Sequence, residues 1–274
     1  MSNRDWVDNA TIFRCEVGSG VHGIASPGTD DRDEMGVCLE PMVQAMGIIE
    51  TFEQHIVRTA AIREQRHDAP SQPGDMDLVI YSLRKWVRLA LKGNPTVLVL
   101  LFAPESAVVC QDARGQNLRE MAPLFASRAA GSQFLGYLQA QRMRLLGERG
   151  QKNVNRRELV EQFGYDTKYA GHMLRLGYQG VEFMETGRFT LPMRERERTR
   201  VMAVRRGEVD INAVLTETGE LEARLKDLLD TSPLPEKPDT AAVEAWMVET
   251  YLEKWKASHP YRYFGPAQKS EAAR

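Results

Sequence analysis

The chain has 274 residues, of which 42% are hydrophobic and 27% charged, a mixture that excludes a disordered protein. At roughly 150 residues per domain, this length allows one large domain or two small ones. The formal net charge of -2 excludes a protein that coats nucleic acid through a uniformly basic surface.

Cysteine content and hydropathy exclude three further classes. Cys15, Cys38 and Cys110 are odd in number and lack CxxC spacing, so we expect neither a disulfide scaffold nor a thiolate zinc site. The longest apolar run, Val97 to Ala103, is far shorter than the ~20 residues of a membrane helix. The N-terminus lacks the layout of a signal peptide. These features predict a cytoplasmic protein without a membrane partner.

The first hundred residues alternate between strand and helix patterns, which indicates a sheet covered by helices. Apolar spacing, β-branched content and Gly or Pro breaks define each element. In chain order we expect a strand at Thr11–Val17, a strand at 31–39, a helix from Pro41 to about Arg66, a polar loop at 67–74, a strand at Asp77–Tyr81, a helix at Ser82–Lys92 and a buried strand at Val97–Phe102.

Helical periodicity dominates beyond residue 104. We expect helices at 133–148, 156–163, 168–177, 195–206, 213–229 and 241–256, one short strand at 188–191, and a Pro-rich linker at 232–238. Trp246, Met247, Leu252 and Trp255 have helical spacing and are expected in the core. The sequence therefore predicts an α+β protein with a sheet domain at 1–110, which holds a metal site, and a mostly helical domain at 111–274.

One stretch carries a pattern typical of phosphate chemistry. A strand ends in Gly18-Ser19, whose backbone N–H groups and hydroxyl offer a cradle for phosphate where the chain turns toward a helix. About a dozen residues later, Asp31 and Asp33 lie on one face of the next strand, since alternate strand residues share a face. Paired carboxylates suit Mg²⁺ or Mn²⁺. Together these features predict nucleotidyl transfer from a nucleoside triphosphate.

This chemistry usually needs a third carboxylate for the metal that activates the attacking hydroxyl. Asp77 is the best candidate, because it heads a strand that could lie beside Asp31–Val37. Asp75, two residues earlier, stays open as an alternative.

The stretch GSGVHGIASPGTDDRDEMGV at residues 18–37 resembles the active-site signature of the DNA polymerase β-like nucleotidyltransferases, and in particular their RNA-repair-pathway branch of bacteria and phages. Segments 81–95, 134–141 and 168–176 resemble further parts of that branch, so the resemblance covers about residues 12 to 255. It implies a polymerase β-like mixed sheet followed by helices, two Mg²⁺ or Mn²⁺ ions as cofactors, a nucleoside triphosphate such as ATP as substrate, and RNA as acceptor.

Carried over residue by residue, the resemblance implies that Gly18 and Ser19 hold the triphosphate and that Asp31 and Asp33 bind both metals, with Asp77 completing the site. The chain departs from its relatives at Val99, where they often carry Glu. Two alternatives therefore stay open. One is adenylylation of a small molecule or a protein by the same fold, and the other is a relative that binds nucleotide or nucleic acid without turnover.

Several basic residues are candidates for nucleotide binding. Lys168, His172 and Arg175 fall on one helix face, and the recurrence of this spacing in the resembled family favours contact with nucleotide phosphate or an acceptor backbone over a solvated face. His22, inside the Gly-rich turn, either touches a phosphate or makes a local hydrogen bond. The arginines of 194–206 alternate with glutamates, which is typical of a solvated helix with internal ion pairs.

Overall fold

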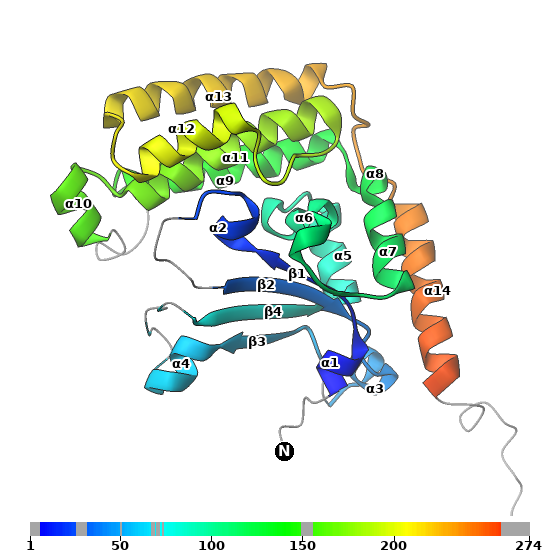
Figure 1. Ribbon diagram of the computed structural model, residues 1–274. Coiled ribbons are helices and arrows are strands. Elements are labelled where there is room, and N and C mark those ends of the chain that lie inside the picture. The colour runs from blue at the N-terminus through cyan, green and yellow to red at the C-terminus, as the bar shows by residue number, and fades with distance from the viewer. Residues whose placement is uncertain are drawn as a thin grey trace, which may run out of the picture.

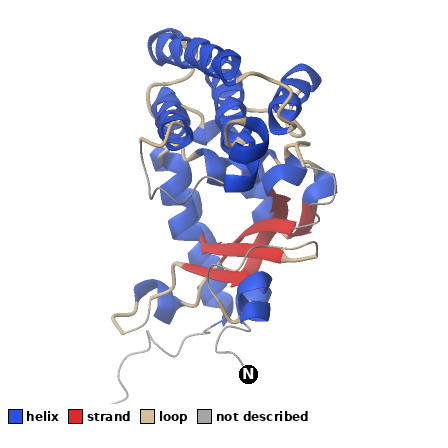
Figure 2. Cartoon of the chain, turned by 90° about the vertical axis from the view of Figure 1, so that its left-hand side faces the viewer, coloured by secondary structure: helices blue, strands red, loops and turns tan. Residues whose placement is uncertain are grey.

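The computed structural model describes residues 6–25, 32–49, 51–66, 69, 72, 74–148 and 156–258. This part of the chain forms an α+β protein, in which one five-stranded sheet lies below a layer of long helices (Figure 1). The view turned by 90° shows the strands in the lower half and most helices above them (Figure 2). The predicted fold class is therefore confirmed, whereas the division at residue 110 stays a prediction.

The sheet contains β1 (Thr11–Val17), β2 (Arg32–Cys38), β3 (Gln54–Arg58), β4 (Met76–Ser82) and β5 (Val108–Gln111), in the order β3-β4-β2-β1-β5. β2 and β4 run parallel, and the other neighbouring pairs are antiparallel. The predicted strands at 11–17, 31–39 and 77–81 are confirmed as β1, β2 and β4, although Asp31 lies outside the described residues.

The long helix predicted from Pro41 to Arg66 is wrong. The segment contains α3 (Met42–Met46), the edge strand β3 and α4 (Thr59–Glu64) instead. Its apolar residues have helical spacing, but they do not share a buried face, since Met46 is 73% and Ile49 98% exposed. Phe52 turns to the lower face of the sheet, where it packs edge-on against Trp6 of α1 (Trp6–Ala10).

The strand predicted at Val97–Phe102 is also wrong, because the segment belongs to helix α6 (Pro95–Phe102). Asn94 caps this helix, with its side chain accepting a hydrogen bond of 2.9 Å from the Thr96 N–H, and Pro95 fits the first turn. Each residue from Val97 to Leu101 is buried. A helix buried on all sides shows no apolar period, so its sequence cannot be distinguished from a buried strand.

Most of the remaining helices correspond to predicted ones, but the helices at 113–120 and 122–125 were not predicted. These remaining helices are α2 (Gly18–Val21), α5 (Leu83–Leu91), α7 (Ala113–Glu120), α8 (Ala122–Phe125), α9 (Arg128–Leu145), α10 (Arg157–Phe163), α11 (Thr167–Thr186), α12 (Glu195–Arg205), α13 (Ile211–Thr231) and α14 (Thr240–Ser258), with a 3-10 turn at Glu105–Ala107. The strand predicted at 188–191 does not form, and β5 was not predicted. None of the helices in the described part has both the length and the apolar content of a bilayer span.

Helix α11 is the centre of the helical layer and packs against α9, α12 and α13. The linker at 232–238 fixes the start of α9, since the Arg128 N–H donates to the Pro235 carbonyl at 2.8 Å. Four apolar residues of the last helix were expected in the core. Trp246, Met247 and Trp255 pack against the hydrophobic core, whereas Leu252 is 47% exposed.

Helix α14 returns to the sheet end of the molecule and packs on α5 and α8 (Figure 1). The Tyr251 hydroxyl donates to the Glu40 carboxylate at 2.8 Å, and the Trp255 indole N–H donates to the Glu40 carbonyl at 3.1 Å. Burial raises the pKa of Glu40, which lies just after the end of β2 at Cys38. The last helix thus holds the end of a central strand.

Two glycines, Gly115 and Gly136, provide a test of how closely α7 packs against β1. An alanine Cβ at Gly115 would lie 2.2 Å from the Ile12 carbonyl oxygen, so Gly115→Ala should lower the free energy of unfolding by about 1–3 kcal/mol. Gly136, a helical glycine in α9, faces open space, so Gly136→Ala should raise it by up to about 1 kcal/mol. Urea denaturation measures both, and equal effects would contradict the close approach of α7 to β1.

Candidate active site

A cavity of about 500 Å³ opens between the sheet and the helical layer. Eight of the nine residues singled out in the sequence line it, and Asp31 lies outside the described residues. From the sheet side these are Gly18, Ser19, His22, Asp33 and Asp77, and from α11 Lys168, His172 and Arg175. Residues far apart in the chain are therefore brought to one cleft, with carboxylates on one wall and cations on the other.

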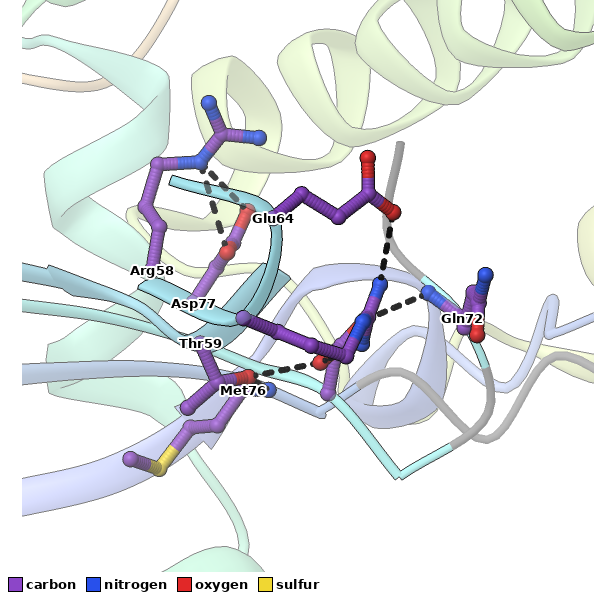
Figure 3. Close-up of polar contacts among 8 residues, drawn as sticks. Arg58, Thr59, Glu64, Gln72, Met76 and Asp77 are labelled. Atoms are coloured by element: carbon purple, nitrogen blue, oxygen red, sulfur yellow. Dashed lines mark hydrogen bonds and ion pairs between the residues drawn. The ribbon is translucent and has the colours of Figure 1, made fainter. Parts of the chain in front are cut away.

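The two described carboxylates lie side by side. Asp33 of β2 is in register with Asp77 of the parallel strand β4, so both side chains lie on the same face of the sheet. Arg58, at the end of β3, points its Nε at both oxygens of Asp77 at 3.4 Å (Figure 3). Carboxylate oxygens are the ligands that a hard divalent cation prefers.

No group of three potential metal-ligating side chains occurs within the described ranges. Glu34 follows Asp33 and lines the cleft, but its carboxylate is buried in ion pairs with Arg14 and with Arg32, the latter at 2.6 Å. Glu34 is therefore already compensated by two cations. Asp33 and Asp77 both line the cleft, Asp77 with Arg58 beside it, and could provide two carboxylate ligands for a metal, while the predicted ligand Asp31 lies outside the described residues.

Position 18 requires glycine because the backbone there lies against the Asp33 side chain. Gly18 has a φ of +75°, in the left-handed region that favours glycine, and an added Cβ would lie 2.1 Å from a carboxylate oxygen of Asp33. The glycine thus lets the end of β1 and the first turn of α2 lie directly against the carboxylate. Ser19 follows in this turn, and its carbonyl accepts from the Ile24 N–H at 3.0 Å, which closes the loop.

Asp75, the alternative third carboxylate, has a different environment. Its oxygens accept hydrogen bonds from Thr59 Oγ1 at 2.9 Å, Arg63 Nη1 at 2.6 Å and the Gln72 N–H at 2.7 Å. The hydrogen bonds from Arg63 above all lower the pKa of Asp75 to about 2. Asp75 therefore fastens α4 to the start of β4 and does not line the cleft, which favours Asp77 as the third acid.

Asparagine substitutions separate these two carboxylates. Asp75→Asn should lower the melting temperature, because it removes the charge that Arg63 and Thr59 bind. Asp77→Asn should leave the melting temperature nearly unchanged and weaken Mn²⁺ binding instead. Thermal unfolding and Mn²⁺ titration followed by electron paramagnetic resonance measure the two effects. A stable Asp75→Asn protein with weakened Mn²⁺ binding would reverse the assignment.

The opposite wall of the cleft is formed by the first three turns of α11. Asp166 caps this helix by accepting from the Lys168 and Tyr169 N–H groups, both at 3.0 Å. The predicted common face of Lys168, His172 and Arg175 is confirmed, since all three line the cavity. An added Cβ at Gly171 would lie 2.6 Å from Arg205 Cγ, so this glycine lets α12 bring Arg205 against α11.

A buried polar network joins the loop after α2 to α11. Arg175 Nη1 donates to His22 Nε2 at 3.1 Å and to Gln179 Oε1 at 2.8 Å, and Arg175 Nη2 donates to His172 Nδ1 at 3.2 Å. Gln179 Nε2 lies 3.0 Å from His22 Nδ1. His22 thus makes a local hydrogen bond, one of the two roles that the sequence left open for it, and this bond connects the two walls of the cleft.

The network carries positive charge without a carboxylate partner in the described part of the chain. Burial lowers the pKa of Arg175 to about 10, which still leaves the guanidinium charged at pH 7. Burial and the charge of Arg175 lower the pKa of His22 well below its usual value, and the same causes lower that of His172 to about 3. A buried cation with neutral partners favours an anionic ligand in the cleft, because buried charges are normally paired.

These shifts predict how stability depends on pH. Both histidines remain neutral in the folded protein, whereas the unfolded chain binds their protons below a pKa of about 6.5. The free energy of unfolding should therefore fall between pH 7 and pH 5, with each histidine contributing up to about 1.4 kcal/mol per pH unit.

The variant His172→Gln should reduce this slope, and His55→Gln on the edge strand serves as the control. Urea denaturation at pH 7, 6 and 5 gives the three slopes. Identical slopes in the wild type and in His172→Gln would show that His172 binds its proton normally in the folded state.

Arg205 in the cleft and Gln179 in the buried network were not singled out as site residues from the sequence. Arg205 was expected on a solvated helix, and its neighbours Arg200 and Arg206 do pair with Glu217 and Glu208. Arg205 itself faces the cleft. Gln179 lies one helical turn after Arg175, and this i+4 spacing was the signal that could have found it. Val99 is buried in α6 and lines the cleft with Thr96.

The comparison with known families agrees with this geometry. Residues 3–249 match the family described as RlaP, the RNA repair pathway DNA polymerase beta family. The chain belongs to this family. No curated protein is similar enough to be matched. Members of the polymerase β-like superfamily are nucleotidyltransferases that generally use divalent metals, so the family membership and the paired carboxylates indicate the same general chemistry.

Proposed function

We propose that this protein transfers a nucleoside monophosphate from a nucleoside triphosphate to a hydroxyl group of RNA, with release of pyrophosphate. The alignment of Asp33 with Asp77, directly beside Gly18, carries the proposal. It puts the ligands for a divalent cation next to a turn whose backbone N–H groups suit a phosphate. The family description supports RNA as the class of acceptor.

Both walls of the cleft would contact the triphosphate, through different residues. Gly18 and Ser19 would bind the triphosphate through the turn that begins α2, and Lys168 and Arg175 would neutralise it from α11. The network of His22 and Gln179 holds the Arg175 guanidinium at the cavity wall, so its donors are oriented before the nucleotide enters.

Asp33 and Asp77, with Asp31, would hold two Mg²⁺ or Mn²⁺ ions. When bound, these ions lower the pKa of the attacking hydroxyl and neutralise charge on the α-phosphate and the leaving group. In the reaction, a bond forms between the acceptor oxygen and the α-phosphorus, the bond from that phosphorus to the β-bridging oxygen breaks, and the acceptor proton passes to solvent.

Incubation with each α-labelled nucleoside triphosphate, Mg²⁺ or Mn²⁺, and separate pools of RNA, DNA, protein and small molecules tests this function. We expect label to appear in RNA. Label in protein or in a small molecule would indicate adenylylation by the same fold. No transfer under any condition would indicate a binding protein without turnover, an outcome that Val99 in the cleft wall makes worth testing.

Substitutions at the carboxylates should abolish transfer without unfolding the protein. Asp33→Asn and Asp77→Asn should each lower the rate at least about 100-fold, because each removes an anionic ligand of the metal. Asp31→Asn should have the same effect. The matched control Asp112→Asn alters a helix cap of α7 outside the cleft and should retain the rate. An active, folded Asp33→Asn protein would contradict the assignment.

A further inference from the structure

A second cavity of about 290 Å³ adjoins the cleft at the end of the helical layer. Its lining includes four cations, Arg144, Arg156, Lys168 and Arg205, and no acidic residue among the described ones. Lys168, His172 and Arg205 line both cavities and form the wall between them. We call this second cavity the basic pocket.

Positive charge converges on the wall between the cavities. Burial lowers the pKa of His172, and the nearby charges of Arg175, Arg205 and Arg144 lower it further. These three arginines come from three different helices. Arg156 is compensated by Asp166, whose carboxylate lies 3.4 Å from its Nη1. The lining still contains Arg144, Lys168 and Arg205 beside Arg156, and this excess of basic over acidic residues among the described ones suits a compact anion carrying several charges.

The size and the aromatic contact of the pocket favour a small ligand over a stacked base. Its volume lies just below the range of about 300–1,000 Å³ typical for drug-sized ligands. The Arg156 guanidinium lies over the Tyr169 ring at 5.6 Å from the centroid, so one face of this ring is already covered. A small polyanion fits these features better than a stacked base.

The basic pocket shares its wall with the residues proposed to neutralise the triphosphate. Lys168 lines both cavities, and Arg175, which lines the cleft, donates to His172 of the shared wall. In an in-line displacement the attacking and leaving oxygens lie on opposite sides of phosphorus. If the acceptor is activated at the carboxylates, the leaving group therefore faces the cationic wall that the basic pocket adjoins.

We propose that the basic pocket binds inorganic pyrophosphate, the leaving group of the reaction, after it moves past Lys168 and His172. This inference rests on the proposed function for the direction in which the phosphates run. The pocket takes the product on its way out of the cleft and leaves the carboxylate end to the acceptor.

Arg144 and Arg142 provide a matched pair of variants in the last turn of α9. Arg144 lines the basic pocket, whereas Arg142 points to α13, where its Nη1 lies 3.5 Å from Glu222. Residues two apart on a helix face different sides, so Arg144→Gln and Arg142→Gln remove the same charge from the same turn. Circular dichroism and melting temperature verify that both variants fold.

Isothermal titration with inorganic pyrophosphate in EDTA measures this site without metal and without turnover. Arg144→Gln should weaken binding about tenfold or more, as expected for the loss of one charge-assisted contact, and Arg142→Gln should change it less than twofold. Equal affinities in the three proteins, or no detectable binding to the wild type, would overturn the proposal.

A second titration, with a single-stranded RNA bearing a 5′-hydroxyl, distinguishes product from acceptor. If Arg144→Gln weakened RNA binding and left pyrophosphate affinity unchanged, the pocket would belong to the acceptor and the proposal would be overturned. If pyrophosphate binding depended on Arg144 while no nucleotide was transferred, the pocket would be supported and the proposed reaction rejected. The two inferences can thus fail separately.

Discussion

The parallel pairing of β2 with β4 is the constraint on which the site depends. It aligns Asp33 with Asp77, and a slip of one residue would turn Asp77 to the opposite face of the sheet. The register is held from both sides. Gly18 lets β1 close against Asp33, and the cluster of Asp75, Thr59 and Arg63 fixes the start of β4. The carboxylates therefore owe their spacing to backbone pairing and not to their own contacts.

The second requirement is a connection between the sheet and the helical layer. Arg175 of α11 supplies it by donating a hydrogen bond to His22 in the loop after α2, and Gln179 accepts from the same guanidinium within α11. A buried guanidinium with neutral partners is costly unless an anion completes its environment. The network thus combines two tasks, because it sets the width of the cleft and leaves a positive charge facing the position where a phosphate would bind.

The sequence predicted the parts of the site that local pattern determines. Gly18-Ser19 directly follows a strand, and the alternation of side chains along the next strand sets the face of Asp33. Helical spacing likewise predicts a common face for Lys168, His172 and Arg175, so these residues could be assigned to one cleft before the fold was known. Arg205 could not, because its approach to the cleft depends on the packing of α12 against Gly171. Similarly, α6 and β3 were predicted wrongly, since complete burial hides a helical period and an exposed edge strand shows none of the expected alternation.

The contact between α14 and Glu40 has a consequence for the order in which the chain can fold. Glu40 lies just after β2, yet its hydrogen-bond partners, Tyr251 and Trp255, are more than two hundred residues away in the sequence. During synthesis the strand that carries Asp33 therefore leaves the ribosome long before the helix that covers its far end. The carboxylate of Glu40 stays exposed to water in the meantime, and this part of the sheet reaches its final packing only after α14 has been made.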